Sequence, residues 1–203
     1  MSIHKETFIF IGASGSGKGT QVALLKDELA KKDPATPIFY LQTGQYFREF
    51  IKGDSYAALM AREAIDKGER APDFLAMYLW SDIFVKNLTG NEHVILDGSP
   101  RSLNEAQNLD IAMKFFKREQ PIVVYLKVSP EWSIQHLLER AKKDARADDS
   151  VDGIKKRVAW FEQDVLPAIN YYRRDREYDF IEIDGEQSIE KVHQDIMRNV
   201  FGA

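Results

Sequence analysis

The sequence predicts an α/β fold of three layers, in which a five-stranded parallel sheet carries helices on both faces. The first observation is that short segments rich in β-branched or aromatic residues alternate with helical segments, an order typical of parallel sheets. The strand candidates are residues 8–11, 37–43, 93–98, 121–128 and 178–185. The second observation is that the middle three are nearly continuous apolar runs, which predicts burial on both faces. Ligands of such folds lie at the carboxyl ends of the strands.

Start and stop signals place the helices between these strands. Ser102 and Glu105 form a capping-box pattern at the start of a helix over 102–118. A long helical segment covers 153–175, and Pro167 predicts a kink in it.

The composition narrows the class of protein. The 203 residues suit one domain with enough apolar material for a core. The net charge is −4 with no strongly basic block, which argues against nucleic acid as a partner. The chain has no cysteine, which excludes thiolate catalysis and Cys-ligated zinc. No apolar run approaches the ~18 residues that a membrane span needs, and the N-terminus lacks a signal-peptide layout, so we expect a cytoplasmic protein with no membrane partner.

A glycine-rich loop follows the first strand candidate. Residues 8–20 read FIFIGASGSGKGT, in which the apolar run ends at Gly12 and a helix-capable stretch follows Lys18. Glycines let backbone N–H groups turn onto an anion, and the helix N-terminus adds the positive end of its dipole. Lys18 is expected to reach the outer phosphates of a nucleotide. Gly19 stands where the general pattern has Ser or Thr, and the hydroxyl follows at Thr20. The alternative is a glycine-rich turn with a surface lysine.

An aspartate ends the third strand candidate. Asp97 lies in VILDGSPR, where a carboxylate at the end of a buried strand faces the glycine-rich loop. Such a carboxylate can hold Mg²⁺, usually through water, since Mg²⁺ dehydrates reluctantly. The alternative is an acidic turn residue, because Asp-Gly is a common turn pair.

Arginines follow the second and third strand candidates and lie in a polar segment further on. They are Arg48, Arg101, Arg140, Arg146 and Arg157. A guanidinium binds phosphate oxygens bidentately and stays charged. Phosphoryl transfer needs mainly alignment, neutralisation of charge and exclusion of water, and an acceptor that is itself a phosphate needs no separate nucleophile. Each arginine taken alone is more often a surface ion-pair partner.

Several ordered motifs resemble those of the adenylate kinases, which are P-loop kinases of nucleoside monophosphates (NMPs). GASGSGKGTQ is similar to the P-loop of that family, LQTGQYFR to its S-T-G-D-x-x-R segment, KGERAPD to G-x-L-V-P-D and DGSPR to D-G-[FY]-P-R. ERAKKDARADD followed by IKKR resembles the short-lid form, and IDGEQS resembles the stretch beside the donor adenine. The resemblance covers essentially the whole chain and implies a three-layer P-loop fold with small NMP-binding and lid lobes.

The resemblance implies a role for each matching position. The catalytic residues would be Lys18, Arg101, Arg140, Arg146 and Arg157. The ATP-binding residues would be Gly15, Ser16, Gly17, Lys18, Gly19, Thr20, Arg140 and Gln187. The AMP-binding residues would be Thr43, Arg48, Glu69, Arg70, Ala71, Gly98, Ser99, Pro100, Arg101, Glu105, Arg146 and Arg157. Asp97 and Thr20 would serve Mg²⁺ through water, and no zinc is expected.

The resemblance also implies a division of the single domain. The core would comprise 1–42, 73–139 and 150–203, with an NMP-binding lobe over 43–72 and a short lid over 140–149. Two short helical pieces, broken near residues 52–54, are expected in the NMP-binding lobe. Both lobes would close on the substrates, with Asp148 and Asp149 fastening the lid, and exclude water. The alternative is solvated surface helix and loop. A monomer is expected.

Four positions depart from the family pattern. They are Gln45 in place of Asp, Ala71 in place of a larger aliphatic residue, Ser99 in place of an aromatic residue and Glu105 in place of Gln. Gln offers an adenine edge both a donor and an acceptor, whereas ionised Glu only accepts and suits a guanine edge. Glu105 could instead simply complete the capping box with Ser102. AMP is therefore the expected acceptor, with GMP, CMP and UMP as alternatives.

The sequence thus predicts an enzyme that transfers the γ-phosphoryl group of ATP reversibly and with Mg²⁺ to an NMP. One competing reading is a P-loop kinase of another small metabolite, against which the TGQYFR segment and the arginines on both sides of the transfer point argue. The other is a nucleotide switch or an inactive binding module. The D-x-x-G and N-K-x-D signatures of a GTPase switch do not occur in the sequence. An inactive relative would be expected to lack the lysine or the arginines.

Overall fold

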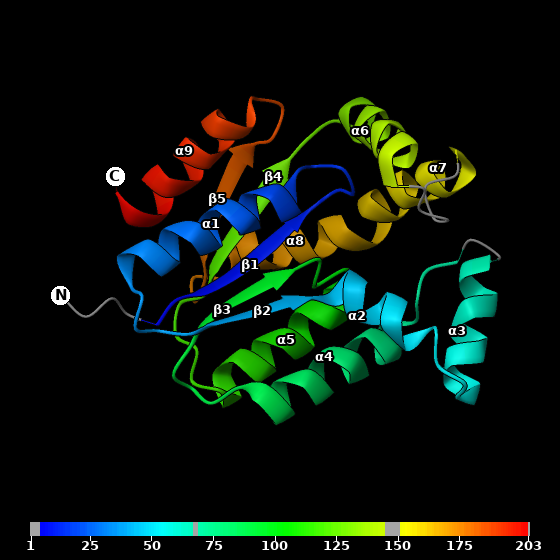
Figure 1. Ribbon diagram of the computed structural model, residues 1–203, viewed down its shortest axis with the longest axis horizontal. Helices are drawn as coiled ribbons and strands as arrows, with labels where there is room; N and C mark the ends of the chain where they lie inside the picture. The colour runs from blue at the N-terminus through cyan, green and yellow to red at the C-terminus, as the bar shows by residue number, and fades with distance from the viewer. Residues whose placement is uncertain (1–4, 67–68, 145–150, 203) are drawn as a thin grey trace.

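The computed structural model describes residues 5–66, 69–144 and 151–202, and Figure 1 shows how they are arranged. At the centre lies a five-stranded sheet of order β2-β3-β1-β4-β5, in which each neighbouring pair runs parallel. The strands are β1 (Thr7–Gly12), β2 (Ile38–Gln42), β3 (His93–Asp97), β4 (Ile122–Lys127) and β5 (Asp179–Asp184). The predicted α/β fold with a five-stranded parallel sheet is confirmed.

Helices connect the strands and cover both faces of the sheet (Figure 1). They are α1 (Lys18–Lys32), α2 (Thr43–Phe50), α3 (Tyr56–Asp66), α4 (Asp73–Asn87), α5 (Leu103–Phe115), α6 (Pro130–Asp144), α7 (Val151–Trp160), α8 (Leu166–Arg174) and α9 (Ile189–Phe201). Helices α1 and α9 pack on one face, and α4, α5 and α8 pack on the other.

Each face of the sheet carries its own hydrophobic core, because successive side chains of a strand point to opposite faces. Phe8 and Phe10 of β1 are fully buried in the core that includes Leu25 of α1. Ile9, between them in the sequence, is buried in the other core, which includes Phe84 of α4. The two cores hold β1 in the middle of the molecule and fix the position of the loop that follows it.

Strand β2 differs from the expectation of burial on both faces. That expectation is confirmed for β3 and for β4 up to Lys127, which is exposed. It is wrong for β2, where Leu41 is buried and the other four residues are half-buried. The reason is the strand order, which puts β2 at the edge of the sheet, paired with β3. The polar side chains of Tyr40 and Gln42 therefore lie on the edge strand, where they can form hydrogen bonds with the end of β3.

The long helix predicted over 153–175 is interrupted near Pro167, as expected. Helix α7 passes into a five-residue π-helix, Phe161–Val165, before α8 begins. Pro167 lies in the first turn of α8. It has no N–H to donate to a carbonyl in the preceding turn, and its ring crowds that turn. The wider π turn accommodates the proline, and its residues Phe161 and Val165 line a cleft described below.

The two predicted lobes are described in part. The segment between β2 and α4 holds α2 and α3, separated by residues 51–55, and Figure 1 shows α3 apart from the sheet. Helix α6 continues to Asp144, so the predicted lid over 140–149 begins inside a helix, and residues 145–149 lie outside the described residues. In the described parts of the chain, no helix is both long and apolar enough to cross a membrane.

Substitution Phe84→Ala should destabilise the fold strongly. The Phe84 ring is fully buried and lies 5.4, 5.9 and 6.0 Å from the ring centroids of Trp80, Phe39 and Phe116. We expect a loss of about 3–5 kcal/mol in the free energy of unfolding, measured by urea denaturation. The neighbouring Val85 is 75% exposed, so Val85→Ala should change it by less than about 0.5 kcal/mol. Equal losses in both variants would contradict this packing.

Candidate functional site

The glycine-rich loop joins β1 to α1 at the carboxyl end of the sheet. β1 ends at Gly12, and α1 begins at Lys18. Gly15 has a φ of +83°, and a Cβ there would lie 2.9 Å from the carbonyl oxygen of Ser133 on α6. Both the positive φ and this close approach require glycine. The resulting tight turn ahead of a helix N-terminus is a geometry that binds anions.

Lys18 folds back over the loop. Its Nζ donates to the carbonyl oxygens of Gly12 and Ala13, both at 2.8 Å, and to Ser16 Oγ at 3.4 Å. The ammonium group is thus held in place by the backbone of the loop that it would serve.

The electrostatic surroundings of Lys18 come from the arginines and one aspartate. The pKa of Lys18 is lowered to about 8, mainly by burial and in part by the nearby Arg101 and Arg140. The carboxylate of Asp97 acts in the opposite direction. These four residues, which are far apart in the sequence, are therefore close enough to interact electrostatically.

Asp97 ends β3, the strand next to β1. The residue is only 6% exposed, and a Cβ added at Gly19 would lie 3.8 Å from Asp97 Oδ2. The carboxylate therefore faces the first turn of α1, which also carries the exposed Thr20. The Tyr40 hydroxyl donates to Asp97 Oδ2 at 3.1 Å, and Gln42 Nε2 donates to it at 3.4 Å. Sequence analysis missed these two partners, although their spacing of two along a strand puts both side chains on one face.

A cleft of about 120 Å³ opens beside the glycine-rich loop. Its lining combines four cationic side chains with the turn after β3 and with aromatic rings, and includes Lys18, Arg70, Arg101, Arg157, Gly98, Pro100, Trp160 and Phe161. Guanidinium and ammonium groups from separate segments converge there on one small space. Such a concentration of positive charge in a confined cleft attracts a polyanion such as a chain of phosphates.

Arg101 occupies the turn after β3. Its Nε donates to the carbonyl oxygen of Gly98 at 2.8 Å. A Cβ added at Gly44 would lie 3.2 Å from Arg101 Nη2 and 3.4 Å from Arg48 Nη1, so these two guanidinium groups are neighbours. A Cβ added at Gly98 would lie 3.4 Å from both Arg101 Nη2 and Thr43 Oγ1. The predicted acceptor residues of the second and third strand ends therefore lie together.

Arg70 is tied to the same region by hydrogen bonds. Its Nη2 lies 2.6 Å from Asp73 Oδ1, and its Nε lies 3.4 Å from Asp164 Oδ2 in the π-helix. Its Nη1 donates to the carbonyl oxygen of Arg101 at 3.3 Å. Arg70 thereby links the start of α4 to the turn after β3.

The remaining predicted acceptor residues lie in the segment before α4 and in the turn after β3. Glu69 is exposed and Ala71 is half-buried in the segment that leads to α4. Ser99 and Pro100 are buried in the turn after β3, where the peptide bond between them is cis.

The predicted lid residues are described only at one end. Arg140 is half-buried on α6 and acts on the pKa of Lys18 as stated above. Arg146, Asp148 and Asp149 lie outside the described residues.

Glu105, the residue predicted either to read the acceptor base or to complete a helix cap, is fully buried. Ser102 Oγ caps α5 by accepting from the backbone N–H of Glu105 at 3.1 Å, which confirms half of the capping box. The Glu105 carboxyl, however, accepts from the backbone N–H of Arg101 at 2.6 Å. Its other oxygen lies 2.7 Å from Ser99 Oγ. Both oxygens are therefore engaged within the fold.

The loop after β5 also lies close to the glycine-rich loop. A Cβ added at Gly185 would lie 2.7 Å from Val128 Cγ1 and 3.6 Å from the carbonyl oxygen of Ser16. Gln187, predicted to lie at the donor adenine, follows in this loop, and its Nε2 donates to the carbonyl oxygen of Asp184 at 2.9 Å.

An aromatic pair on α6 lies beside the glycine-rich loop and was missed by sequence analysis. The rings of Trp132 and His136 stack with their centroids 4.4 Å apart and their planes at 24°. A Cβ added at Gly15 would lie 3.5 Å from His136 Cβ. The spacing of four residues on a helix, which puts both rings on one face, was the available signal.

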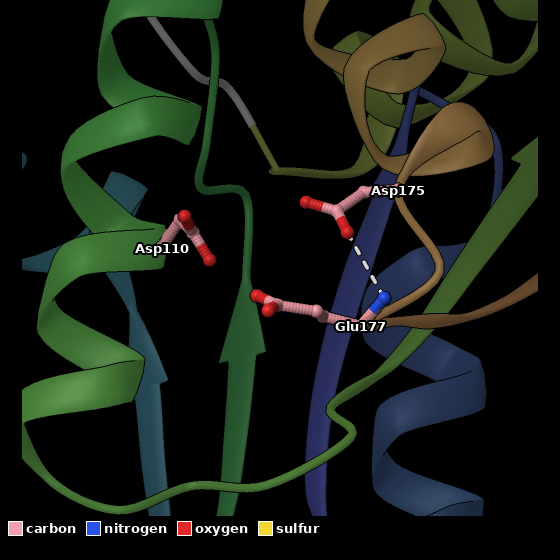
Figure 2. A group of neighbouring side chains, drawn as sticks. All are labelled: Asp110, Asp175 and Glu177. Carbon is pink, nitrogen blue, oxygen red and sulfur yellow. Dashed lines mark hydrogen bonds between the residues drawn. The ribbon is translucent and has the colours of Figure 1, made fainter.

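A group of carboxylates lies at the opposite end of the sheet, where Asp110, Asp175 and Glu177 point toward one another (Figure 2). The ammonium group of Lys114 already lies there, 3.2 Å from Asp110 Oδ2 and 2.7 Å from Glu177 Oε2. The Tyr178 hydroxyl donates to Asp110 Oδ1 at 2.8 Å. This group therefore ties α5 to the start of β5. A hollow of about 450 Å³ lies beside this group. The candidate functional site is nevertheless the smaller cleft at the carboxyl end of the sheet, because the convergent arginines line that cleft.

The fold and this site together define a P-loop protein of the α/β class, and comparison with known proteins identifies its family. Residues 10–177 match the family model described as "Adenylate kinase". The chain is 31% identical to an adenylate kinase from Azobacteroides pseudotrichonymphae genomovar. CFP2, over 93% of this chain and 94% of the relative. It is 33% identical to an adenylate kinase from Prochlorococcus marinus (strain MIT 9515), over 90% and 92% of the two chains. The chain belongs to the adenylate kinase family.

Substitution Gly185→Ala should destabilise the protein where the loop after β5 packs against Val128, the residue that follows β4. The added methyl group would overlap Val128 Cγ1 at 2.7 Å, and overpacking of this kind costs about 1–3 kcal/mol of unfolding free energy. Gly19→Ala is the control, because its nearest neighbour would be 3.8 Å away and alanine favours a helix. Thermal denaturation should show a lower midpoint for Gly185→Ala only. An unchanged midpoint in Gly185→Ala would show that the loop after β5 does not lie this close to Val128.

Proposed function

We propose that this chain catalyses the reversible transfer of the γ-phosphoryl group of ATP to AMP, which yields two molecules of ADP. The observation that carries the proposal is the convergence of Lys18, Arg70, Arg101 and Arg157 on one cleft beside the glycine-rich loop. Membership of the adenylate kinase family supports the same reaction. The relatives named above are themselves adenylate kinases.

The proposed mechanism relies on positioning and charge. The glycine-rich loop from Gly15 to Thr20 holds the ATP phosphates, and Lys18 leaves its carbonyl partners to bind the outer ones. Arg48 and Arg101, which are neighbours, hold the phosphate of AMP. An oxygen of that phosphate attacks the γ-phosphorus, and the bond from phosphorus to the bridging oxygen of ADP breaks. The attacking phosphate is already ionised, so no general base takes part.

Arginines near the transferring group neutralise its charge in the transition state. Arg157 lines the cleft together with Lys18, and Arg140 is near enough to affect the pKa of Lys18. We assign both of them, with Arg146, to the γ-phosphoryl group. Removal of one such group typically costs about 10²–10³ in kcat.

The residues around Asp97 fit Mg²⁺. The ion takes oxygen ligands and keeps several waters, and the Asp97 carboxylate faces the turn that carries Thr20. When bound with ATP, Mg²⁺ neutralises charge on the phosphate oxygens. Tyr40 and Gln42 orient the carboxylate through their hydrogen bonds to Oδ2.

We further propose that the lobes over 43–72 and 140–149 close over the substrates and exclude water, with Asp148 and Asp149 fastening the lid. Exclusion of water matters because water could otherwise accept the phosphoryl group. Gln187 contributes to the donor adenine site, and Trp132 and His136 offer a stacked aromatic pair beside the glycine-rich loop. We assign the acceptor base to the segment formed by Glu69, Arg70 and Ala71 and by the turn 98–101. The expected cytoplasmic location and monomeric state stay predictions.

The burial of Glu105 bears on the choice of acceptor. A carboxylate that faced the acceptor base would favour guanine, which offers two adjacent N–H donors. Because both oxygens of Glu105 are engaged within the fold, this argument for GMP loses its basis. AMP is the acceptor that we propose.

A phosphoryl-transfer assay tests the function directly. With ATP and Mg²⁺, we expect rapid ADP formation with AMP and little with GMP, CMP or UMP. Lys18→Ala and Arg101→Ala should each lower kcat by about 10²–10³. Arg198→Ala is the control, because this exposed arginine pairs with Asp195 on α9, and its rate should match the parent. ATP binding without transfer to any of the four acceptors would indicate an inactive binding module instead.

The affinity for ATP should fall as the pH rises above about 8. Lys18 has a pKa of about 8 in the free protein, and its neutral form loses the attraction to phosphate. Once the free protein is mostly neutral at Lys18, the Kd should rise about tenfold for each pH unit. Calorimetric titration between pH 7.5 and 9.5 measures this. Arginine stays charged in this range, so Lys18→Arg should show a flat profile, whatever its absolute affinity. A flat profile in the parent would contradict the lowered pKa of Lys18.

A further inference from the structure

A chain of close oxygen contacts runs from α5 to the end of β3. Glu105 is fully buried; its Oε2 accepts from the backbone N–H of Arg101 at 2.6 Å, and its Oε1 lies 2.7 Å from Ser99 Oγ. Ser99 Oγ lies 3.1 Å from Thr43 Oγ1, which lies 3.0 Å from the carbonyl oxygen of Asp97. Three contacts thus link one carboxyl group, two hydroxyl groups and one carbonyl group.

Each of these three contacts needs one proton between its two oxygens if it is to be a hydrogen bond. The hydroxyl groups of Ser99 and Thr43 carry one proton each, and the carbonyl oxygen of Asp97 only accepts. If Glu105 is ionised, two protons serve three contacts, and one pair of oxygens is left facing each other without a proton. A proton on Glu105 completes the chain, which then runs in one direction from Glu105 to Asp97.

We propose that Glu105 is a positioning residue that carries a proton at neutral pH and donates the first hydrogen bond of this chain. The chain passes through Ser99 and Thr43 and ends on Asp97. It joins the segment after β2 to the turn after β3, which together carry the proposed acceptor residues. This inference rests on the proposed function, because Arg101 is assigned there to the phosphate of AMP and Ser99 lies in the turn assigned to the acceptor base.

The groups that face Glu105 are consistent with its neutral form. Burial raises the pKa of the Glu105 carboxyl, and Asp73 on α4 raises it further. The backbone N–H of Arg101, the hydroxyl of Ser99 and the Arg101 guanidinium lower the pKa, but the net shift is upward. Tyr172 on α8 also faces this region, and burial raises its pKa well above the usual value, so it stays neutral too.

A protonated carboxyl group accounts for two departures from the family pattern together. A carboxylic acid offers one donor and one acceptor side by side, as the carboxamide of Gln does. Ser99 stands where the family has an aromatic residue, and its hydroxyl group accepts a hydrogen bond from Glu105 and donates one to Thr43. The two substitutions are therefore chemically matched.

The substitution Glu105→Gln tests the protonation state through stability. The amide keeps one donor and one acceptor but does not ionise. A carboxyl group with a raised pKa in the fold stabilises the protein most below its unfolded pKa of about 4.3, and this contribution is lost as the pH rises toward the folded pKa. Urea denaturation should therefore give similar midpoints for parent and variant at about pH 4, below the unfolded pKa. At higher pH the unfolding constant of the parent should rise relative to that of the variant, by up to about tenfold per pH unit within this window.

Glu92→Gln is the matched control, because Glu92 is also buried but is an ionised partner of Arg118. Although burial raises the pKa of Glu92, hydrogen bonds from Thr89 and Gly90 bring it below its usual value. Its charge therefore stabilises the fold above the unfolded pKa, and this contribution is lost as the pH falls. Glu92→Gln should be less stable than the parent at pH 7 and approach it in acid, which is the opposite trend.

Infrared spectroscopy gives a second measurement, and its decisive result is obtained on the parent protein. In protein labelled with ¹³C-glutamate, the parent at pH 7 should show the C=O stretching band of a protonated carboxyl group. Glu105→Gln should lose this band, and Glu92→Gln should keep it. Absence of the band in the parent, or identical pH dependence of stability in the parent and Glu105→Gln, would overturn the inference.

The acceptor preference separates this inference from the proposed function. If Glu105 positions the segment, the ratio of kcat/KM for AMP to that for GMP should stay the same in Glu105→Gln. A shift of that ratio toward AMP would show that Glu105 reads the base, and would overturn the inference while leaving the kinase activity in place. A parent that forms no ADP would overturn the proposed function, yet the stability and infrared measurements would still test the protonation of Glu105.

Discussion

The parallel pairing of β1 with β3 is the constraint on which the site depends. Their register puts Phe10 beside Asp97, so β1 ends two residues further on, next to the end of β3. Strand β2 pairs with β3 in the same direction and places Gln42 beside Asp97. Three strands therefore deliver their next residues to one edge of the sheet: the glycine-rich loop, the segment from Thr43 and the turn after Asp97. Antiparallel pairing of any of them would send its following loop to the opposite end.

The cationic side chains at this edge are held in place by local acceptors before any ligand binds. Lys18 is bonded to loop carbonyls, Arg101 to the carbonyl oxygen of Gly98, and Arg70 to Asp73 and Asp164. Each contact offsets part of the repulsion between like charges in a small cleft. The guanidinium groups of Arg101 and Arg70 are already oriented and need little reorganisation when a phosphate arrives. Such preorganisation is a main source of electrostatic catalysis.

The sequence was sufficient for features that depend on local chemistry. The strands, the glycine-rich loop, the cap at Ser102 and the break near Pro167 all follow from neighbouring residues. The edge position of β2 could not be predicted, because strand order depends on how the whole chain packs. The contacts of Tyr40 with Asp97 follow from that order.

The state of Glu105 also lay beyond the sequence. The capping-box pattern correctly placed its backbone at the start of α5, but its side chain turned toward Ser99 and Arg101. Whether a carboxyl group is ionised depends on burial and on partners brought together by folding. The sequence showed Ser99 only as a departure from the family motif, because its contact with Glu105 forms only on folding.

The bonds of Lys18 to the carbonyl groups of Gly12 and Ala13 mean that ligand entry is an exchange and not a simple addition. In the free protein the ammonium group of Lys18 is held by the carbonyl groups at the start of the loop, and these hydrogen bonds must break before it can bind phosphate. When product leaves, the same carbonyl oxygens can again accept hydrogen bonds from the ammonium group of Lys18, so loss of the ligand is coupled to the return of the loop to its free conformation.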